Sequence, residues 1–292
     1  MSATATHPSG SLAHLADATR LGAVALRITD LDRAIGFYTE VIGLTVHGRD
    51  GADAALGAGG EDLVMLHEER SASPAGRHAG LYHFALLFPT REGLARACRR
   101  IAEQRVPIDG ASDHGTHEAI YLPDPDGIGI ELAADRPRER WPMRDGRVQF
   151  AGGPHPLDVR SLFATISDEE ASPRADAGLR MGHVHLHVGD LAASTRFYRD
   201  GLGFEVIAEM GSAVFVSAGR YHHHVGFNLW RGAGAGPAQA DAIGLRHWTL
   251  ETADAGERNA LALRLEAIEA PYSERDGALF ARDPSGIDVL IR

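Results

Sequence analysis

Apolar and polar residues alternate in four segments of the chain, and each segment is followed by a stretch of helical character. The apolar positions of these segments are Val24/Leu26/Ile28, Phe84/Leu86/Phe88, Val184/Leu186/Val188 and Trp248/Leu250. A period of two predicts β-strands with one face in the core. Helices are predicted for 31–42, 91–105, 191–200 and 255–269, and short β-like runs broken by Gly, Pro or Asp follow each of them. The same unit, a strand, a helix and about three further strands, therefore occurs four times.

The first and third units share residues without a gap. Residues 22–44 and 182–204 match at a Gly, an Asp-Leu pair, a Phe-Tyr pair and a second Gly, and Asp124–Gly127 recurs as Asp283–Gly286. Within this match, Asp30 and Asp190 suit the N-cap positions of two helices. A duplicated scaffold explains shared packing and turn residues. The differences between the copies therefore indicate where function resides.

These patterns predict an α+β fold built from four βαβββ modules. Modules one and two occupy 21–135, and modules three and four occupy 179–292. The stretch between them, 136–178, is of mixed composition and is expected to be a linker that wraps the surface. Residues 1–20 are expected to form a mobile N-terminal tail.

The net charge, the apolar runs and the cysteine count indicate which partners and which compartment the protein has. The formal net charge of −11 argues against nucleic acid or an anionic membrane surface as the main partner. No apolar run approaches the roughly 18 residues that span a membrane, and residues 1–20 lack the pattern of a signal peptide. A single cysteine, Cys98, rules out an intramolecular disulfide and suits a reducing compartment. We therefore expect a cytoplasmic protein that binds neither nucleic acid nor membrane, and homo-oligomer formation stays open.

Three histidines share one face of the strand at 182–190. Because the alternate residues are apolar, His183, His185 and His187 point away from the core. Burying three imidazoles without partners is costly, so this face requires a polar or solvated cavity. Module one has Ala, Ala and Arg at the corresponding positions. A face that is rich in histidine in one copy alone indicates a site.

Modules two and four carry one histidine each at the position that is equivalent to His183. These residues are His83 and His247. In the last strand of module two, Glu131 points away from the apolar core, whereas module four has Leu290 there. Two histidines and one carboxylate on three neighbouring strands, with coordination positions left open, suit mononuclear non-haem Fe(II).

A second histidine cluster, His222–His224, precedes the apolar strand that ends near Asn228. Strict alternation places His222 and His224 on the same face as Asn228 and places His223 on the other face. A β-bulge would reverse this assignment.

These motifs resemble those of the vicinal oxygen chelate superfamily, and within it those of the two-domain extradiol ring-cleaving dioxygenases of the catechol 2,3-dioxygenase type. The likeness extends over nearly all of 21–292. The motifs that carry it are the repeated strand starts, the Asp-Leu…Phe-Tyr…Gly helices, Leu81–Leu87, Gly110–His114, Asp124–Glu131, Asp135–Trp141, Met181–His187 and Tyr221–Asn228. The resemblance implies that the four modules form two half-barrel pairs.

The resemblance further implies a metal held by histidines from the first strands of two modules and by a glutamate after the Asp-Pro-x-Gly turn. These ligands map to His83 and His183, with His247 as the remaining histidine at this position, and to Glu131. In many such enzymes all three ligands come from the two C-terminal modules, but here Leu290 replaces the carboxylate of that pair. Modules two and three together supply His83, His183 and Glu131. We therefore expect module two to pair with module three and module one with module four, as in some ring-cleavage relatives.

Two further roles follow from the same resemblance. A tyrosine ten residues before the glutamate lines the family's site, and Tyr121 has that spacing. A histidine pair before an apolar strand supplies the family's acid–base group, and this pair maps to the 222–224 tract with His223 and His224 as the candidates.

The function expected from these residues is that of an extradiol dioxygenase, which opens the ring of a catechol or a related dihydroxylated aromatic with O2 at Fe(II), with Mn(II) as the alternative metal. Histidine suits the proton transfer because its ordinary pKa is near neutral. Two alternatives stay open on the same fold, a glyoxalase-like metal-dependent isomerase or transferase and a metal-free protein that binds a small molecule. The former usually takes a second carboxylate from the last strand of module three, where this chain has Asn228.

Overall fold

The computed structural model describes residues 14–145, 147–150 and 153–292 of the chain. Module one contains β1 (Arg20–Ile28), α1 (Leu31–Phe37), the π-helical turn η1 (Tyr38–Ile42), β2 (Thr45–Asp50), β3 (Asp53–Gly57) and β4 (Asp62–Glu68). Module two contains β5 (Gly80–Phe88), α2 (Arg91–Glu103), β6 (Gly110–Asp113), β7 (His117–Pro123) and β8 (Gly129–Asp135). The expected order of strand, helix and three strands is therefore present in both.

The second half of the chain repeats this order. Module three contains β12 (Arg180–His187), α4 (Leu191–Thr195), the π-helical turn η3 (Arg196–Gly201), β13 (Glu205–Glu209), β14 (Ala213–Ser217) and β15 (Val225–Asn228). Module four contains β16 (Gly244–Glu251), α5 (Ala255–Ala267), β17 (Tyr272–Arg275), β18 (Ala278–Arg282) and β19 (Asp288–Ile291). Between the halves lie η2 (Arg138–Arg140), β9 (Met143–Arg144), β10 (Arg147–Val148), β11 (His155–Pro156) and α3 (Val159–Ala164). The α+β fold of four modules is confirmed.

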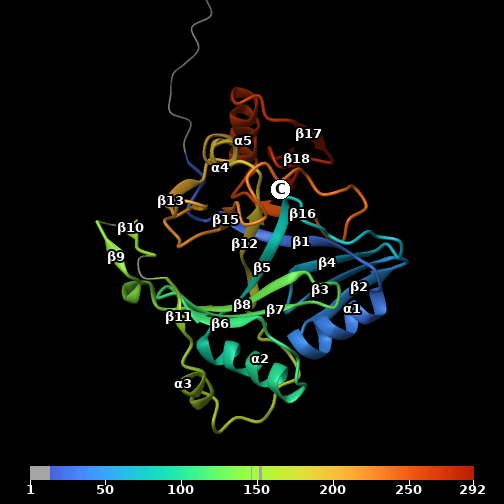
Figure 1. Cartoon of the computed structure of the whole chain (residues 1–292), viewed down its shortest axis with the longest axis vertical. Helices are drawn as coiled ribbons and strands as arrows, with labels where there is room; N and C mark the ends of the chain where they lie inside the picture. The colour runs from blue at the N-terminus through green and yellow to red at the C-terminus, as the bar shows by residue number, and fades with distance from the viewer. Residues whose placement is uncertain (1–13, 146, 151–152) are drawn as a thin grey trace, which may run out of the picture.

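The modules combine into two large sheets. One has the strand order β17-β18-β19-β16-β1-β4-β3-β2, and the other has the order β11-β6-β7-β8-β5-β12-β15-β14-β13. In each sheet two modules meet through their first strands, which run antiparallel: β1 pairs with β16, and β5 pairs with β12. Figure 1 shows these four strands crossing near the centre of the molecule. Strand pairing therefore joins module two to module three and module one to module four.

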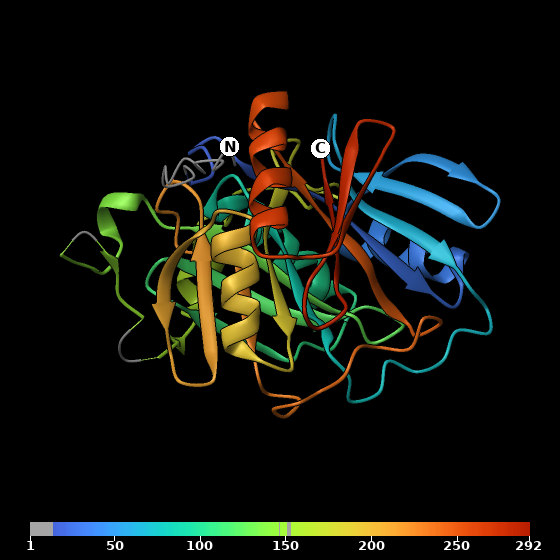
Figure 2. The same ribbon diagram turned by 90° about the horizontal axis from the view of Figure 1, so that it is seen from above.

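The apolar positions of the four first strands form one core between the two sheets. Every residue of the alternating pattern, from Val24 to Leu250, is buried, and those residues belong to a single hydrophobic cluster. Helices cover this core from the outside. Helix α2 lies against β8 and against η1 of module one, and α5 lies against η3 of module three, as the view in Figure 2 also shows for α5. Asp30 and Asp190 cap α1 and α4 through the backbone N–H groups of Arg33 and Ala193, as expected.

Two buried tyrosine–aspartate pairs link modules that are neighbours in sequence but lie in different sheets. The Tyr38 hydroxyl donates to Asp124 Oδ2 at 3.2 Å, and the Tyr198 hydroxyl donates to Asp283 Oδ2 at 2.9 Å. The other oxygen of each aspartate accepts two backbone N–H groups of its own Asp-Pro-x-Gly turn. The repeated Phe-Tyr and Asp-Pro-x-Gly motifs are thus two sides of one contact, which holds the sheets together.

The repeated glycine after the first and third helices has a physical cause. Gly43 and Gly203 adopt φ values of 90° and 87°, which residues with a Cβ atom rarely adopt. A Cβ atom at either position would lie 2.9 Å from a buried guanidinium nitrogen, of Arg100 or of Arg264. These arginines donate to the last carbonyl groups of the π-helical turns, for example from Arg100 to the Ile42 carbonyl at 2.7 Å. Each arginine therefore ties its own module's helix to the preceding module.

Residues 14–20 differ from the mobile tail that was expected. Leu15 is 4% exposed and donates its backbone N–H to the Gly203 carbonyl at 3.0 Å, and Thr19 is also buried. Residues 1–13 lie outside the described residues. A single apolar residue that packs against another element leaves no periodic signal, which is why the sequence does not reveal this contact.

The linker adds a strand to the second sheet and also packs on the surface of the molecule. Its strand β11 pairs with β6 and extends the second sheet by one edge strand. Trp141 is buried, and its indole N–H donates to the Arg136 carbonyl at 2.8 Å. No helix among the described residues has the length and apolar character to cross a membrane.

The tyrosine–aspartate pairs predict a specific dependence of stability on pH. Burial raises the pKa of Asp283 to about 6. Because this lies above the value of an unfolded aspartate, the stabilising contribution of the protonated group is complete below about pH 4 and is lost as the pH rises through 6. Asp283→Asn keeps an oxygen for the turn and cannot ionise, so we expect the fall in unfolding free energy between pH 4 and 7 to shrink by about 2 kcal/mol. Urea unfolding across this range measures it, and parallel profiles for the two proteins would contradict it.

Candidate metal centre and its cavity

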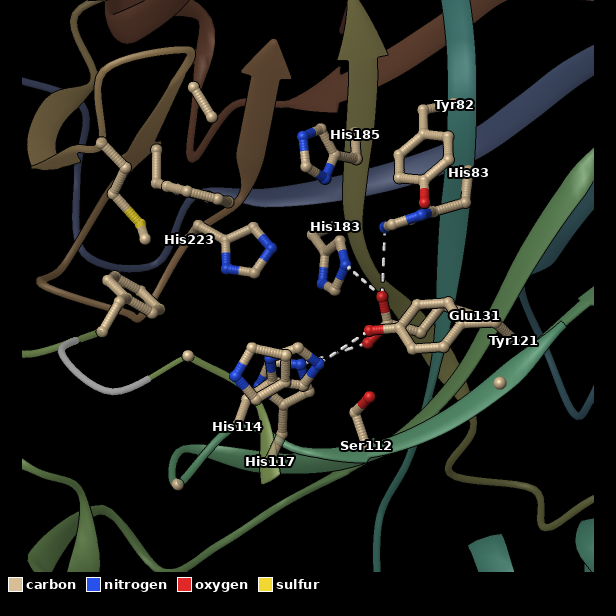
Figure 3. A pocket seen from close by; sticks show the side chains of 18 of the residues that line it. Tyr82, His83, Ser112, His114, His117, Tyr121, Glu131, His183, His185 and His223 are labelled. Atoms are coloured by element: carbon tan, nitrogen blue, oxygen red, sulfur yellow. Dashed lines mark hydrogen bonds and ion pairs between the residues drawn. The ribbon is translucent and has the colours of Figure 1, made fainter. Parts of the chain in front are cut away.

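A cavity of about 710 Å³ opens on the face of the second sheet that is turned away from the core. Side chains from β5, β7, β8 and β12 form its floor, and they point toward one another in Figure 3. Its wall includes apolar and aromatic side chains from the linker and from module three, namely Pro142, Phe150, Pro154, Met210, Phe215 and Trp230. The cavity is thus polar at the floor and apolar along part of its wall.

His83, Glu131 and His183 converge on the floor. Glu131 Oε2 lies 3.1 Å from His83 Nε2 and 3.1 Å from His183 Nε2. The three residues come from adjacent strands in the order β8-β5-β12, and all three are buried. The residue that pairs with both Glu131 and His183 across these strands is Ala85, whose small side chain leaves the space between them open.

The donor atoms fit a divalent metal ion. Facial ligands that are each about 2.1 Å from one octahedral ion lie about 3 Å from one another, which is close to the separations around Glu131 Oε2. The second oxygen, Oε1, lies 3.1 Å from His117 Nε2, and it is a buried atom without a hydrogen-bond partner among the described residues. A buried carboxylate oxygen that lacks such a partner is what a cation would compensate.

The protonation states of these groups also suit metal binding. Burial raises the pKa of Glu131, but its contacts with His183, His117 and His83 together outweigh burial and hold the pKa well below its usual range. Burial lowers the pKa of His183, and it lowers that of His185 further. The carboxylate is therefore ionised while these imidazoles are neutral, and these are the forms that coordinate a metal.

His117 and His114 lie beside the three converging residues, and neither was singled out as a site residue from the sequence. His117 shares a face of β7 with Tyr121, which pairs with Glu131 on β8. The rings of His114 and His117 stack at 4.6 Å, and His114 Nε2 lies 2.8 Å from the Tyr121 hydroxyl. Burial lowers the pKa of His114 to about 4 and raises that of Tyr121, so both groups are neutral. The spacing of four residues between His117 and Tyr121, which puts both on one strand face, is the signal that could have found them.

Within the 222–224 tract, His223 is the histidine that reaches the cavity. Because β15 begins only at Val225, the tract lies in a loop, and strand alternation does not govern it. The His223 ring lines the cavity and lies 4.1 Å from the His183 ring. His224 turns away, and its Nδ1 accepts the backbone N–H of Ala218 at 3.1 Å. The faces are therefore the reverse of those that strict alternation assigns.

The rest of the histidine face of β12 forms a hydrogen-bonded group around Asn228. Its amide nitrogen lies 2.9 Å from His185 Nε2, and its oxygen lies 2.8 Å from His187 Nδ1. The ring of Tyr82 contacts both histidines, and Tyr82 itself is 40% exposed. The three histidines predicted to share one face do so, but of these only His183 approaches Glu131 among the described contacts.

His247 lies on the other sheet. It is part of β16, which pairs with β1 and β19, and it lines a separate cleft together with Arg27 and Arg246. Among the described residues, the groups of side chains that could hold a metal ion include neither His247 nor any other residue of module four.

Two family models match the chain. Residues 20–132 match the Glyoxalase/Bleomycin resistance protein/Dioxygenase superfamily, and residues 180–219 match a bleomycin resistance protein-like N-terminal region. A catechol-2,3-dioxygenase of Bacillus subtilis (strain 168) is 37% identical over 271 residues, which cover 91% of this chain and 94% of that protein. These relationships therefore extend over both halves of the sequence.

Solved structures share the fold. A Bacillus subtilis protein described only as a candidate dioxygenase superposes with a TM-score of 0.66 at 15% identity, over 93% of this chain and 84% of that one. Glyoxalase I from Zea mays superposes with a TM-score of 0.59 at 19% identity, over 94% of this chain and 92% of that one. At these identities the likeness concerns the fold alone.

The geometry predicts which side chains hold the metal. We expect His83→Ala, His183→Ala and Glu131→Ala each to abolish stoichiometric Fe(II) binding, because each removes one of three converging donors. His247→Ala is the matched control, since it removes a histidine at the equivalent position of the other sheet, and it should keep the metal. Iron is measured by elemental analysis after anaerobic reconstitution, with circular dichroism to check the fold. Loss of iron in His247→Ala alone would contradict this assignment.

Proposed function

The chain belongs to the extradiol ring-cleaving dioxygenases of the vicinal oxygen chelate superfamily, and we propose that it opens the ring of a catechol or a related dihydroxylated aromatic at a metal held by His83, His183 and Glu131. The observation that carries the proposal is the convergence of these three donors at the floor of a cavity with a partly aromatic wall. The 37% identity to a catechol-2,3-dioxygenase supports the substrate class.

Fe(II) is the metal that we propose, with Mn(II) as the alternative. Two imidazoles and one carboxylate leave coordination positions open, which suits non-haem iron. When bound, the metal supplies the oxygen chemistry of ring cleavage. The protein supplies orientation, a neutral imidazole at His183 and an ionised carboxylate at Glu131.

His223 is the proposed acid–base group. Its ring lies 4.1 Å from that of His183, so a ring hydroxyl that approaches the metal ligands comes close to it. Burial lowers the pKa of His223 well below its usual range, so the imidazole is neutral and keeps a ring nitrogen with a free lone pair. Tyr121, oriented by His114, is placed to donate a hydrogen bond to a substrate oxygen. Phe150 and Phe215, whose rings stack at 5.2 Å, offer a flat surface for an aromatic ring.

The glyoxalase-like alternative is disfavoured by Asn228. A second carboxylate from the last strand of module three would be needed there, whereas the amide of Asn228 is bound to His185 and His187. A metal-free binding protein has no need of an ionised carboxylate among buried imidazoles, because such a group is costly without a compensating cation.

We also propose a cellular location and a metabolic role for the protein. A cytoplasmic location is supported by the single cysteine, Cys98, which is buried and whose pKa burial raises to about 12. A role in aromatic catabolism follows from the proposed substrate class.

The reaction is tested with oxygen. Anaerobic protein reconstituted with Fe(II) and mixed with a catechol should consume about one O2 per ring opened, with a yellow ring-fission product. An oxygen electrode and absorbance spectroscopy measure both quantities, and the apoprotein is the control. If a broad panel of catechols and hydroquinones gives no oxygen uptake with the metal bound, the proposed substrate class is wrong.

The acid–base assignment is tested within the histidine tract. His223→Gln should lower kcat by roughly a hundredfold or more while iron content stays near that of the wild type, because the proton acceptor is removed and no ligand is lost. His224→Asn keeps an oxygen for the Ala218 N–H, and its side chain faces away from the cavity, so kcat should stay within about threefold. If the two variants lose activity equally, His223 is not the acid–base group.

A further inference from the structure

A chain of hydrogen bonds runs behind His223, on the side away from the cavity. His223 Nδ1 lies 2.8 Å from His222 Nδ1, and His222 Nε2 lies 3.0 Å from Asp135 Oδ1. The Tyr221 hydroxyl donates to Asp135 Oδ2 at 3.0 Å. His222 is 1% exposed, and its ring packs between those of His117 and Tyr221, so it has little freedom to turn.

His222 and Asp135 also form, with His117, a second cluster of groups of the kind that bind metals. The ring geometry argues against a metal there. The His117 and His222 rings are stacked at 4.6 Å with only 16° between their planes. An imidazole binds a metal in its own plane, so the lone pairs of two stacked rings run side by side and do not converge on one ion. The cluster therefore calls for an explanation in terms of hydrogen bonding.

The direction of each hydrogen bond in the chain can be assigned. Burial raises the pKa of Asp135, but its contacts with His222, His117 and Tyr221 together outweigh burial, so the net pKa is lowered and the carboxylate is ionised and can only accept. Burial lowers the pKa of His222 to about 3, so this ring carries one proton. That proton must be on Nε2, which faces the carboxylate. His222 Nδ1 is then an acceptor, and His223 must donate to it from Nδ1.

We propose that Asp135 and His222 are positioning residues that fix the tautomer of His223, with the proton on Nδ1 and the lone pair of Nε2 available to the substrate. The inference rests on the proposed function, since it concerns the proton that His223 accepts there. When a ring hydroxyl gives up its proton, the O–H bond breaks, its electron pair stays on the ring oxygen, and a new N–H bond forms at His223 Nε2. The imidazolium keeps its hydrogen bond to His222, and the negative charge of Asp135 lies behind it, as an orienting carboxylate does for a catalytic histidine.

Asp135→Asn tests this arrangement with almost no change of shape. The Tyr221 hydroxyl should hold the amide oxygen at the Oδ2 position, so that the amide NH2 faces His222 Nε2. His222 must then carry its proton on Nδ1, and His223 must carry its own on Nε2, where a base is no longer available. We expect kcat to fall by about a hundred- to ten-thousandfold, with KM and iron content within about threefold of the wild type. Asp53→Asn is the matched control, because it breaks a carboxylate–histidine pair of similar length, to His67, on the other sheet.

A spectroscopic measurement makes the test independent of turnover. Long-range ¹H–¹⁵N correlation spectra of histidine-labelled apoprotein, with His223 assigned through His223→Gln, report which ring nitrogen carries the proton. The expected result is Nδ1–H in the wild type and Nε2–H in Asp135→Asn. Nε2–H in the wild type overturns the inference, and so does an unchanged kcat in the variant of an active enzyme. If the wild type has the expected tautomer but opens no catechol, the proposed function fails while the hydrogen-bond assignment stands.

A second pair of variants covers the case in which Asp135→Asn does not fold. The side-chain oxygen of Asn takes the position of histidine Nδ1, so His222→Asn keeps an acceptor for His223. The longer Gln places its amide near histidine Nε2, so His222→Gln keeps the contact with Asp135 and loses that acceptor. We expect kcat of His222→Asn to exceed that of His222→Gln by at least about tenfold. Equal values would overturn the inference, because a purely structural role would not distinguish the two.

Discussion

The antiparallel pairing of β5 with β12 is the constraint on which the cavity depends. It places His83 opposite His185 and Ala85 opposite His183, and β8 then adds Glu131 from the other side of β5. A slip of one residue would turn the three histidines of β12 into the apolar core and expose Val184 and Leu186. The register is therefore set by the burial of apolar side chains on one face of the sheet. The same register fixes the relative positions of the polar side chains on the other face.

Two kinds of contact divide the work of holding the chain together. Backbone hydrogen bonds join two modules within each sheet, whereas the tyrosine–aspartate pairs and the arginines that cap the π-helical turns join modules across the two sheets. The side-chain contacts account for the Tyr, the Asp-Pro-x-Gly turn and the second Gly that the two halves share, and none of these residues lines the cavity. The side chains on the outer faces of the two sheets can consequently differ without loss of these contacts. One sheet carries Glu131 close to His83 and His183. The other sheet has Leu290 on β19, the strand that pairs with β16, to which His247 belongs.

The sequence predicts the elements whose pattern is local. Alternation marks the four first strands, Asp30 and Asp190 mark two helix starts, and the single histidine-rich face together with Glu131 indicates a metal site. What it misses depends on contacts that are distant in sequence. Asp135 gains its significance from a histidine 87 residues later. The choice between His223 and His224 depends on where β15 begins, and Phe150 reaches the cavity from a linker without regular pattern.

The pairing of β1 with β16 has a consequence for the newly made chain. Val24 pairs with Trp248, which leaves the ribosome roughly 220 residues later, or about 10 to 45 s at ordinary rates of translation. During that interval β1 has its parallel neighbour β4 and an open edge on its other side. The sheet with the cavity needs only residues up to β15 and can close earlier. The sheet without the proposed metal ligands can therefore be completed only after all strands of the sheet with the cavity have been made.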